Sequence, residues 1–396
     1  MAKKVYNPYE KYGVRRAVNA YGTLTKVGGS ISPPEVFKAM EDASKSFVQI
    51  PELQQWAGKV IAGATGAEAG LPTAGSSNSI LLAAAACMMK GTELEEYDPI
   101  ERETWTKIIQ KLPMHTDGLK TEFIVQKSNR NTYDHAVECA GGRFVEVGTE
   151  EGATEEELDE AFDPEKTAAY YITDRSAGGH LPLATVAEIA HKHGVPVIID
   201  AASELPPKKN LRRYLEKGAD LVVISGGKFI AGPNNSGILA GRKDLIKLAH
   251  LQAYPFHGIG RSSKMCRETI VGFVTALNKY LELDEKPLFK EWEKKAKWLA
   301  DQLDTIPDIE AGVTYDTTVE ENEPICPICY VEIDEEAYGM TGRDLLDKLR
   351  EGNPSVEARY AAATRRVAIN PEFLLEGDEA LIADRIKKIL ASARKR

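Results

Sequence analysis

Lys228 and Asp200 are the two residues of this chain whose types and positions best fit a catalytic pair. Residues 195–199 and 219–224 are short apolar runs, each typical of a buried strand in a parallel sheet. The first run ends in Asp200, and the second leads into Ser225 and, after two glycines, Lys228. Ligands of open α/β sheets bind beyond the carboxyl ends of the strands, so we expect this carboxylate and this amine at one sheet edge. A lysine that forms a Schiff base and an acid that holds a ring nitrogen are what pyridoxal 5'-phosphate (PLP) chemistry requires.

Both residues also have a plainer interpretation. A lysine that follows a strand is most often a solvated surface residue, and an aspartate there often caps a helix or forms a turn. The two glycines before Lys228 instead allow the backbone to approach a ligand closely. Burial beside a pyridinium lowers the pKa of a lysine, which makes it a usable nucleophile and proton carrier. In the functional interpretation Asp200 forms an ion pair with the pyridinium nitrogen of PLP.

A candidate phosphate site comes from four polar or small residues, Gly75, Ser76, Ser77 and Asn78. We expect residues 70–79 to form a loop and N-cap before a buried apolar helix over 80–89. A helix N-terminus with hydroxyls and free N–H groups binds anions, although the same residues would also serve as a simple cap. Ser225 adds a hydroxyl to this site, and Ser203 is placed to reach the ring hydroxyl of the cofactor.

Other motifs are absent or weak. A Walker P-loop is excluded because Val222 stands six residues before Lys228 and Phe229 follows it, where glycine and serine or threonine are needed. Cys326 and Cys329 form one lone Cys-x-x-Cys pair, which favours buried strand cysteines over a metal or redox site. We therefore expect no metal. Two residues of a basic loop, Arg261 and Lys264, could bind an anionic end of a substrate or simply be solvated.

Composition limits the classes of partner. The chain has 396 residues, of which 43% are hydrophobic, and a formal net charge of −10. The length suits one large and one smaller domain with a sizeable core, and the acidic balance argues against a nucleic-acid partner. No run of about 18 apolar residues exists, so we expect no membrane association. The N-terminus lacks the apolar core of a signal peptide, and five cysteines are few and odd in number, so a reduced cytoplasm is expected.

The order of the predicted elements indicates an α/β fold. Strand and helix patterns alternate from about residue 66 to 245, which is typical of a mostly parallel, doubly wound sheet. Beyond Gly272 longer helices flank short strands at 329–333 and 366–369, which suggests a smaller α+β domain.

Several segments resemble one known group of proteins. The chain is similar to the selenocysteine synthase-like group of PLP-dependent fold-type I enzymes, and within it to the D-glucosaminate-6-phosphate ammonia-lyase branch. The resemblance covers nearly the whole chain and is carried by residues 18–23, 28–30, 65–69, 130–135, 199–206, 225–228 and 232–233. These motifs together are specific for the group and less specific for one substrate.

The resemblance implies a division of the chain and a set of roles. It implies a large PLP-binding domain over 51–275, a small domain over 276–396, and an N-terminal segment, 1–50, that packs with the small domain. It implies a homodimer or larger homo-oligomer with active sites at a subunit interface. It supports Lys228 as the Schiff-base lysine and implies that Arg359 binds the substrate carboxylate, a task that suits a planar guanidinium.

Two features of the chain differ from relatives. A histidine that can stack on the cofactor ring is often found where this chain has Asn129. His135 or Tyr133 could stack on the ring instead, or the stacking differs, and the identity of the substrate is left open for the same reason. We also expect His135 to bind the substrate. The chain also lacks the N-terminal tRNA-binding portion expected of a true selenocysteine synthase, which argues against a tRNA substrate.

These observations predict a PLP-dependent, ammonia-lyase-like enzyme. We expect α,β-elimination from a small hydroxylated amino acid or amino-sugar acid, which gives a 2-keto acid and ammonia. A transferase, aldolase or racemase on the same scaffold is the nearest alternative, because the same lysine and aspartate serve all of them. A non-catalytic PLP-binding protein is a further alternative, although such a protein has no need of this pair.

Overall fold

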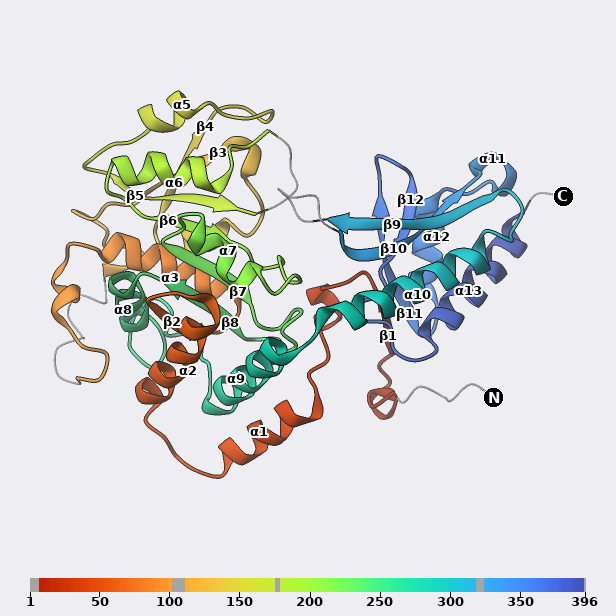
Figure 1. The fold of residues 1–396 in the computed structure, drawn as a ribbon, viewed down its shortest axis with the longest axis horizontal. Coiled ribbons are helices and arrows are strands. Elements are labelled where there is room, and N and C mark those ends of the chain that lie inside the picture. The colour runs from red at the N-terminus through yellow and green to blue at the C-terminus, as the bar shows by residue number, and fades with distance from the viewer. Residues whose placement is uncertain (1–6, 102–110, 175–178, 318–323, 395–396) are drawn as a thin grey trace. The chain divides into compact units, whose positions relative to one another are not determined.

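The computed structural model describes residues 7–101, 111–174, 179–317 and 324–394 (Figure 1). The chain divides into two compact units. The large unit comprises Ser30–Leu283, and the small unit comprises Met1–Gly29 together with Asp284–Arg396. Each unit has its own sheet and its own apolar core.

The sheet of the large unit has seven strands in the order β2-β8-β7-β6-β5-β3-β4. Five of them, from β7 to β4, pair in parallel, whereas β8 is antiparallel to both of its neighbours. The prediction of a mostly parallel sheet is therefore confirmed, since β8 alone of these seven strands runs in the reverse direction. The strands are β2 (Ala69–Thr73), β3 (Glu122–Gln126), β4 (Arg143–Val147), β5 (Thr167–Thr173), β6 (Val197–Asp200), β7 (Leu221–Ser225) and β8 (Gly237–Gly241).

Strand β2 corrects one expectation, because residues 70–73 belong to this strand and not to a loop. Gly70 lies so close to α2 (Ile50–Thr65) that a Cβ atom on it would overlap the side chain of Ile61. Pro72 is tolerated because β2 is the edge strand of the sheet. Glycine and proline, which usually mark turns, here allow close packing at an edge.

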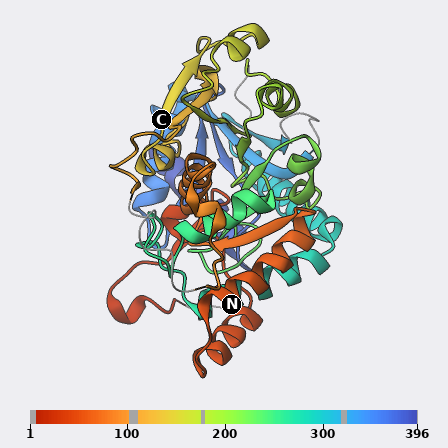
Figure 2. The same cartoon turned by 90° about the vertical axis from the view of Figure 1, so that its left-hand side faces the viewer.

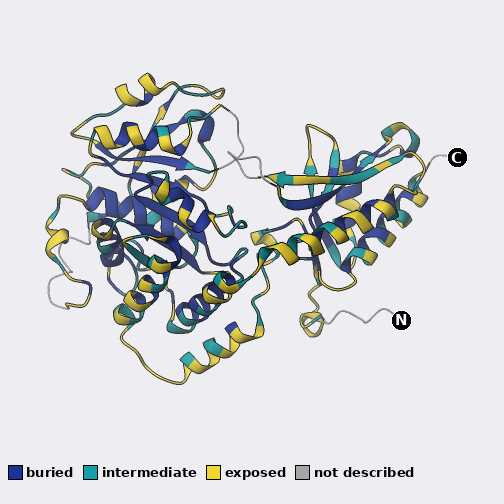
Figure 3. Ribbon diagram, in the orientation of Figure 1, coloured by how far each residue is buried: buried dark blue, intermediate teal, exposed yellow. Residues whose placement is uncertain are grey.

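Helices cover both faces of this sheet, as the ribbon shows from two sides (Figures 1 and 2). Successive side chains of a strand point to opposite faces, so β6 sends Ile198 into one core and Ile199 into the other. Burial is nearly continuous through β5, β6, β7 and β8, whereas the edge strand β4 is partly exposed and many exposed residues lie on the helices and loops (Figure 3). The face with Ile199 packs against α1 (Pro34–Ser44), α2, α5 (Glu155–Glu160), α6 (Leu183–Lys192), α7 (Asn210–Glu216) and α9 (Arg267–Glu282). The face with Ile198 packs against α3 (Ser76–Met89), α4 (His135–Cys139) and α8 (Lys243–Gln252).

Strand register brings the candidate residues to one end of the sheet. Asp200, the last residue of β6, pairs with Thr173 of β5 on one side and with Val223 of β7 on the other. Gly237 of the antiparallel strand β8 pairs with both Ser225 and Thr73. The carboxyl ends of β2, β5, β6 and β7 therefore lie along the same edge, where ligands of α/β proteins bind.

The small unit is built around a five-stranded sheet in the order β1-β11-β12-β10-β9. Strand β1 pairs in parallel with β11, and the other pairs are antiparallel. Apolar side chains of α10, α12 and α13, together with Tyr338 of α11, complete its core. The elements are β1 (Ala17–Ala20), α10 (Glu285–Leu303), β9 (Ile309–Thr317), β10 (Pro324–Ile333), α11 (Glu335–Tyr338), α12 (Gly342–Glu351), β11 (Ser355–Ala361), β12 (Arg366–Ile369) and α13 (Asp378–Ala393).

Candidate active site

Lys228 lies in a tight, hydrogen-bonded loop directly after β7. The Gly226 N–H donates to the Ser236 carbonyl, and the Ala231 N–H donates to the carbonyl of Lys228, each over 2.9 Å. A Cβ on Gly227 would lie 2.6 Å from the backbone of Asn234, so this loop has no room for a side chain there. Burial lowers the pKa of Lys228 below its ordinary value of 10.5, although nearby carboxylates oppose the shift. A half-buried lysine with a depressed pKa is a suitable nucleophile and base.

Asp200 is buried at the end of β6 and within electrostatic range of Lys228. Burial raises the pKa of Asp200 to about 6, and the charge of Asp134 adds to that shift. The Ala202 N–H, which donates to Oδ1 over 3.0 Å, and the ammonium of Lys228 both act in the opposite direction. A buried carboxylate is costly unless a cation or a donor meets it, so Asp200 is poised to accept a charged N–H group.

The loop between β2 and α3 has the features of an anion site. Gly75 has φ +91°, a backbone conformation that favours glycine, and it precedes the first turn of α3. Asn78 accepts the Ala74 N–H through Oδ1 over 3.3 Å, while its buried Nδ2 has no hydrogen-bond partner among the residues that the structure describes. Ser76 is half-buried and Ser77 is exposed at the same helix end. An unused buried donor beside free helical N–H groups is suited to bind an anion.

Ser225 is buried at the end of β7 and is separated from the Gly75 loop only by the start of β8. A Cβ on Gly237 would lie 2.7 Å from the carbonyl carbon of Gly75, so the lysine strand and the phosphate loop pack closely. Ser203, in contrast, is exposed, and its side chain bonds to the carboxyl group of Glu204. The structure thus brings Ser225 and Gly75–Asn78 together, while the role of Ser203 toward the ring hydroxyl of the cofactor stays a prediction.

Glu204 is a further candidate residue, which sequence reasoning did not single out. Burial raises the pKa of its carboxyl group to about 7, the charge of Asp174 raises it further, and Lys228 lowers it. Its peptide is fixed, because the Glu204 N–H donates to the Ala201 carbonyl and the Asn210 side chain donates to the Glu204 carbonyl over 2.6 Å. A carboxyl group that titrates near neutrality beside the candidate lysine has the properties of a general acid or base.

Asn129 occupies a structural position at the same edge of the sheet. Its amide Nδ2 donates to the Thr173 carbonyl over 2.9 Å, and its Oδ1 accepts the Thr173 N–H over 2.7 Å. His135 is exposed and pairs with Glu138, and Tyr133 is exposed as well. The side chain of Asn129 is therefore fixed by two hydrogen bonds to the backbone of Thr173, at the end of β5. Neither His135 nor Tyr133 lies in the buried part of the site.

Arg261 and Lys264 lie in one loop of the large unit, on the same aromatic ring. Their cationic groups lie 5.2 and 5.7 Å from the ring centroid of Tyr254. The loop is fixed by Gln252, whose side chain accepts the Ile259 N–H over 3.2 Å. The two predicted anion-binding residues thus form a compact basic cluster of their own.

Arg359 belongs to the small unit, in β11. Its guanidinium donates to Oδ2 of Asp316 over 2.7 Å, and its buried Nε has no partner within the described part of the chain. Burial raises the pKa of the nearby Glu372 to about 8, with a further contribution from the charge of Asp316 and an opposing one from Arg359. One arginine donor group is left to meet a carboxylate ligand.

The donor set suits PLP, because it combines an amine of low pKa, a buried carboxylate and a glycine-lined loop with an unused amide donor. Among the described residues, no cluster of three or more His, Cys, Asp or Glu side chains is placed to hold a metal ion. Cys326 and Cys329 are buried in β10, and burial raises the pKa of both thiols, as expected for core cysteines. Over the same ranges, no helix has the length and apolar character needed to cross a bilayer.

Comparisons with known proteins agree with this geometry. Residues 121–344 match the class-V aminotransferase family. The chain is 30% identical over 391 residues to the 5'-C-glycyluridine monooxygenase-decarboxylase of a Streptomyces species, a match that covers 96% of this chain and 92% of that protein. It is 28% identical over 394 residues to the D-glucosaminate-6-phosphate ammonia lyase of Salmonella typhimurium, with 98% and 99% covered. A solved structure of D-glucosaminate-6-phosphate ammonia-lyase superposes with a TM-score of 0.81 at 28% identity, over 98% of this chain and 99% of that one.

Proposed function

The chain belongs to the class-V aminotransferase family, and on that premise we propose that it is a PLP-dependent ammonia-lyase. Its substrate is a small hydroxylated amino acid or amino-sugar acid, and its products are a 2-keto acid and ammonia. The placement of Lys228 and Asp200 within electrostatic range of each other at one sheet edge is the observation that supports this proposal most directly. The similarity to an ammonia lyase over nearly the whole chain supports the reaction type.

When bound, PLP supplies an electron-withdrawing ring that stabilises negative charge on the α-carbon of the substrate. Gly75 and Asn78 bind its phosphate through backbone and amide donors, and Asp200 accepts the N–H of its ring and keeps that nitrogen protonated. Lys228 anchors the cofactor in the resting enzyme. These four roles use only groups that the structure places at the carboxyl ends of β2, β6 and β7.

The chain also supplies the proton transfers of an elimination. Nζ of Lys228, with its lowered pKa, takes the proton from the α-carbon. The carboxyl group of Glu204 gives a proton to the leaving β-hydroxyl group, which departs as water. Hydrolysis of the released imine consumes one water and yields ammonia, so the reaction converts the hydroxylated amino acid into a 2-keto acid and ammonia with no net change in water.

A product screen tests the proposal. The PLP-loaded protein is incubated with a panel of hydroxylated amino acids and amino-sugar acids, and we expect equal amounts of keto acid and ammonia from at least one. Lys228→Ala should form neither product and should carry no PLP after borohydride reduction and mass spectrometry. The matched control is Lys192→Ala, at an exposed position of α6. Glycine plus an aldehyde would indicate an aldolase instead, inversion of the amino acid a racemase, and unmodified Lys228 in the wild-type protein would refute the cofactor assignment.

A second candidate comes from the Streptomyces relative, whose name describes a monooxygenase-decarboxylase. Its similarity to this chain is comparable to that of the lyase, so oxidative loss of a substrate carboxylate as CO2 is an alternative reaction of the same site. This candidate would be favoured if the protein released CO2 and consumed O2 but formed neither ammonia nor the keto acid of the elimination. The same panel of substrates measures both reactions.

We also propose a homodimer or larger homo-oligomer that acts in the cytoplasm. Large apolar side chains are exposed around α1 and α2, among them Phe37, Phe47 at 95% and Trp56. An exposed apolar group of this kind is typical of a protein interface. All five cysteines are free, which fits a reducing compartment. Light scattering of the purified protein measures the oligomeric state, and a monomer at micromolar concentration would contradict the proposal.

A further inference from the structure

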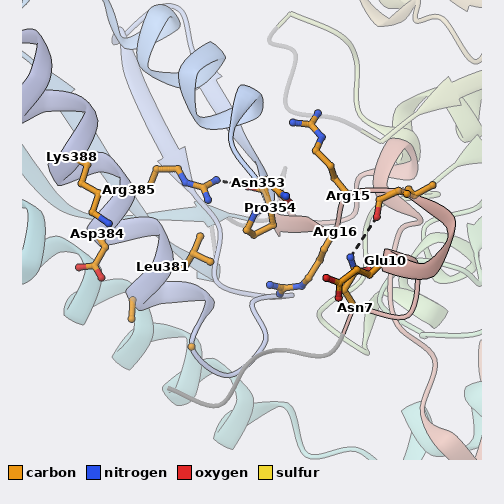
Figure 4. Close-up of a pocket in the computed structure, with 14 residues that line it drawn as sticks. Asn7, Glu10, Arg15, Arg16, Asn353, Pro354, Leu381, Asp384, Arg385 and Lys388 are labelled. Atoms are coloured by element: carbon orange, nitrogen blue, oxygen red, sulfur yellow. Dashed lines mark hydrogen bonds between the residues drawn. The ribbon is translucent and has the colours of Figure 1, made fainter. Parts of the chain in front are cut away.

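The small unit contains a cavity of about 860 Å³ that takes no part in the proposed reaction. Its walls are the N-terminal segment before β1, the loop that contains Asn353 and Pro354, and one face of α13 (Figure 4). The lining residues of α13 and its N-cap share one face, as their helical spacing requires; they lie at positions 377, 380, 381, 384, 385 and 388. A volume of this size accommodates a metabolite and not only a simple ion.

Cationic groups dominate the polar part of this wall. Arg15, Arg16, Arg385 and Lys388 line the cavity together with two carboxylates, Glu10 and Asp384. Arg16 is neutralised, because its guanidinium pairs with the buried carboxylate of Asp378 over 2.5 Å. For the other three cations the described residues provide no carboxylate within 4.0 Å.

The two remaining arginines are positioned by backbone groups. Arg15 donates to the carbonyls of Glu351 and Gly352, each over 3.0 Å, at the C-terminal end of α12. Arg385 points toward the 353–354 loop and donates to the Pro354 carbonyl (Figure 4). A Cβ on Gly352 would overlap Nη1 of Arg385, so the lack of a side chain at this position leaves room for the guanidinium against the chain. Both side chains are thus held in place and keep further N–H donors for a ligand.

The guanidinium of Arg385 is also partly removed from water, and among the described residues no carboxylate offsets the cost of that burial. Burial lowers its pKa from the ordinary value of 12.5, and no charge of opposite sign offsets that effect. A guanidinium that is partly buried and has only a carbonyl acceptor gains free energy when an anion meets it.

We propose that this cavity binds a small metabolite through its phosphate group. The guanidinium of Arg385 and the ammonium of Lys388, three residues apart on the same face of α13, favour a doubly charged tetrahedral anion over a single carboxylate. Apolar contact to the body of the molecule comes from Val14 and Leu381, and acceptors for its hydroxyl groups come from Glu10, Asp384 and Asn7. None of these residues belongs to the proposed PLP site, so the site goes beyond the proposed function.

Calorimetry with inorganic phosphate tests the proposal. The titration uses the full chain loaded with PLP, so that the cofactor's own phosphate site is filled, in a chloride buffer of low ionic strength. We expect saturable binding that weakens about tenfold or more in Arg385→Gln and in Lys388→Gln. Lys388 is exposed, so its variant separates a loss of binding from a loss of structure. Arg394→Gln, at the end of the same helix but outside the cavity, is the control and should bind as the wild type does.

Three outcomes would overturn the site. The first is the absence of saturable binding in the wild-type protein. The second is binding that survives both cavity variants but is lost when Arg261 and Lys264 are replaced by glutamine, which would assign the anion to the basic loop of the large unit. The third is equal affinity for acetate, which would rule out selection of a phosphate group. None of these results depends on whether the protein is an ammonia-lyase.

Discussion

The hydroxyl group of Tyr214 donates a hydrogen bond to Oδ2 of Asp174 over 2.6 Å, and this bond joins α7 to the residue that follows β5. The Asp174 N–H in turn donates to the Asp200 carbonyl over 2.9 Å. Burial and the charge of Asp174 raise the pKa of Tyr214 well above its ordinary value of 10.0, so the phenol stays a donor. The bond holds the Asp174 carboxylate where its charge favours the protonated form of Glu204.

Glu204 should set one limb of the pH profile. Its carboxyl group has a pKa of about 7, and the protonated form is the one that can donate to the leaving hydroxyl group. We expect kcat/KM to fall as the pH rises above about 7, and this limb should be absent from the residual activity of Glu204→Gln. Glu216→Gln, at an exposed position of α7, should keep the wild-type profile. A limb that persists in Glu204→Gln would assign the titration to another group.

Asp200→Asn should have opposite effects on stability and on cofactor binding. The folded-state pKa of Asp200 is raised from 3.8 to about 6, so the folded protein binds a proton that the unfolded chain releases in this window. The stability of the cofactor-free wild type therefore falls as the pH rises from about 4 to about 6, and the loss is complete above that range. Asparagine carries no charge, so the cofactor-free variant should be more stable above about pH 6 by at most about 3 kcal/mol and equal to the wild type below about pH 4.

Urea unfolding at several pH values measures this stability difference. PLP should bind less tightly to Asp200→Asn, because an amide cannot hold the ring nitrogen in its protonated form. Equilibrium dialysis measures that affinity. A variant that is less stable than the wild type in neutral solution would show that Asp200 is stabilised by contacts other than the cofactor.

Gly227→Ala should damage the lysine loop. The added methyl group would lie 2.6 Å from the Cα and carbonyl oxygen of Asn234, and backbone atoms at that distance cannot simply rotate away. We expect a loss of stability of about 1 to 3 kcal/mol and reduced attachment of PLP to Lys228, measured by unfolding and by mass spectrometry. Gly63→Ala, in α2 with open space around it, is the matched control and should be neutral or stabilising. Normal PLP attachment in Gly227→Ala would contradict the assigned close packing.

Arg359→Gln should weaken substrate binding. Its guanidinium pairs with Asp316 and retains an unused buried donor, Nε, among the described residues. If it binds the substrate carboxylate, its loss should raise KM about tenfold or more, with a smaller change in kcat. Arg366→Gln, on the neighbouring strand β12 and paired with Glu332, should leave KM unchanged. An unchanged KM in Arg359→Gln would remove this residue from the substrate site.

Much of the large unit could be predicted from its sequence. The buried strands β3, β5, β6 and β7 are short apolar runs, and their order along the chain implies a parallel sheet. Strand β2 could not be predicted this way, because Gly70 and Pro72 usually mark turns and only the edge position makes them acceptable. In the small unit, β9 has mostly half-buried and exposed residues, so it lacks the apolar run by which strands are recognised.

Residues of the candidate site could be predicted only where a reactive or polar side chain directly adjoins a recognisable strand or helix. Lys228 and Asp200 follow apolar runs directly, and Gly75–Asn78 precede an apolar helix. Glu204 lies in a loop with no periodic pattern, and its raised pKa depends on burial and on Asp174, which belongs to another strand connection. The sequence segment 199–206 contained Glu204 as part of a family motif, and that was the one available signal.

The antiparallel pairing of β2 with β8 has a consequence for biosynthesis. Strand β2 has its ladder partner in β8 alone, which the ribosome makes after every other strand of this sheet. The loop at Gly75 is therefore synthesised early. The strand that fixes its position, Gly237–Gly241, is synthesised much later. Pairing across so long a stretch of sequence is slow, because loop closure must precede the contacts that stabilise it. If Gly75 belongs to the cofactor's phosphate site, we expect the cofactor to bind only after β2 has paired with β8.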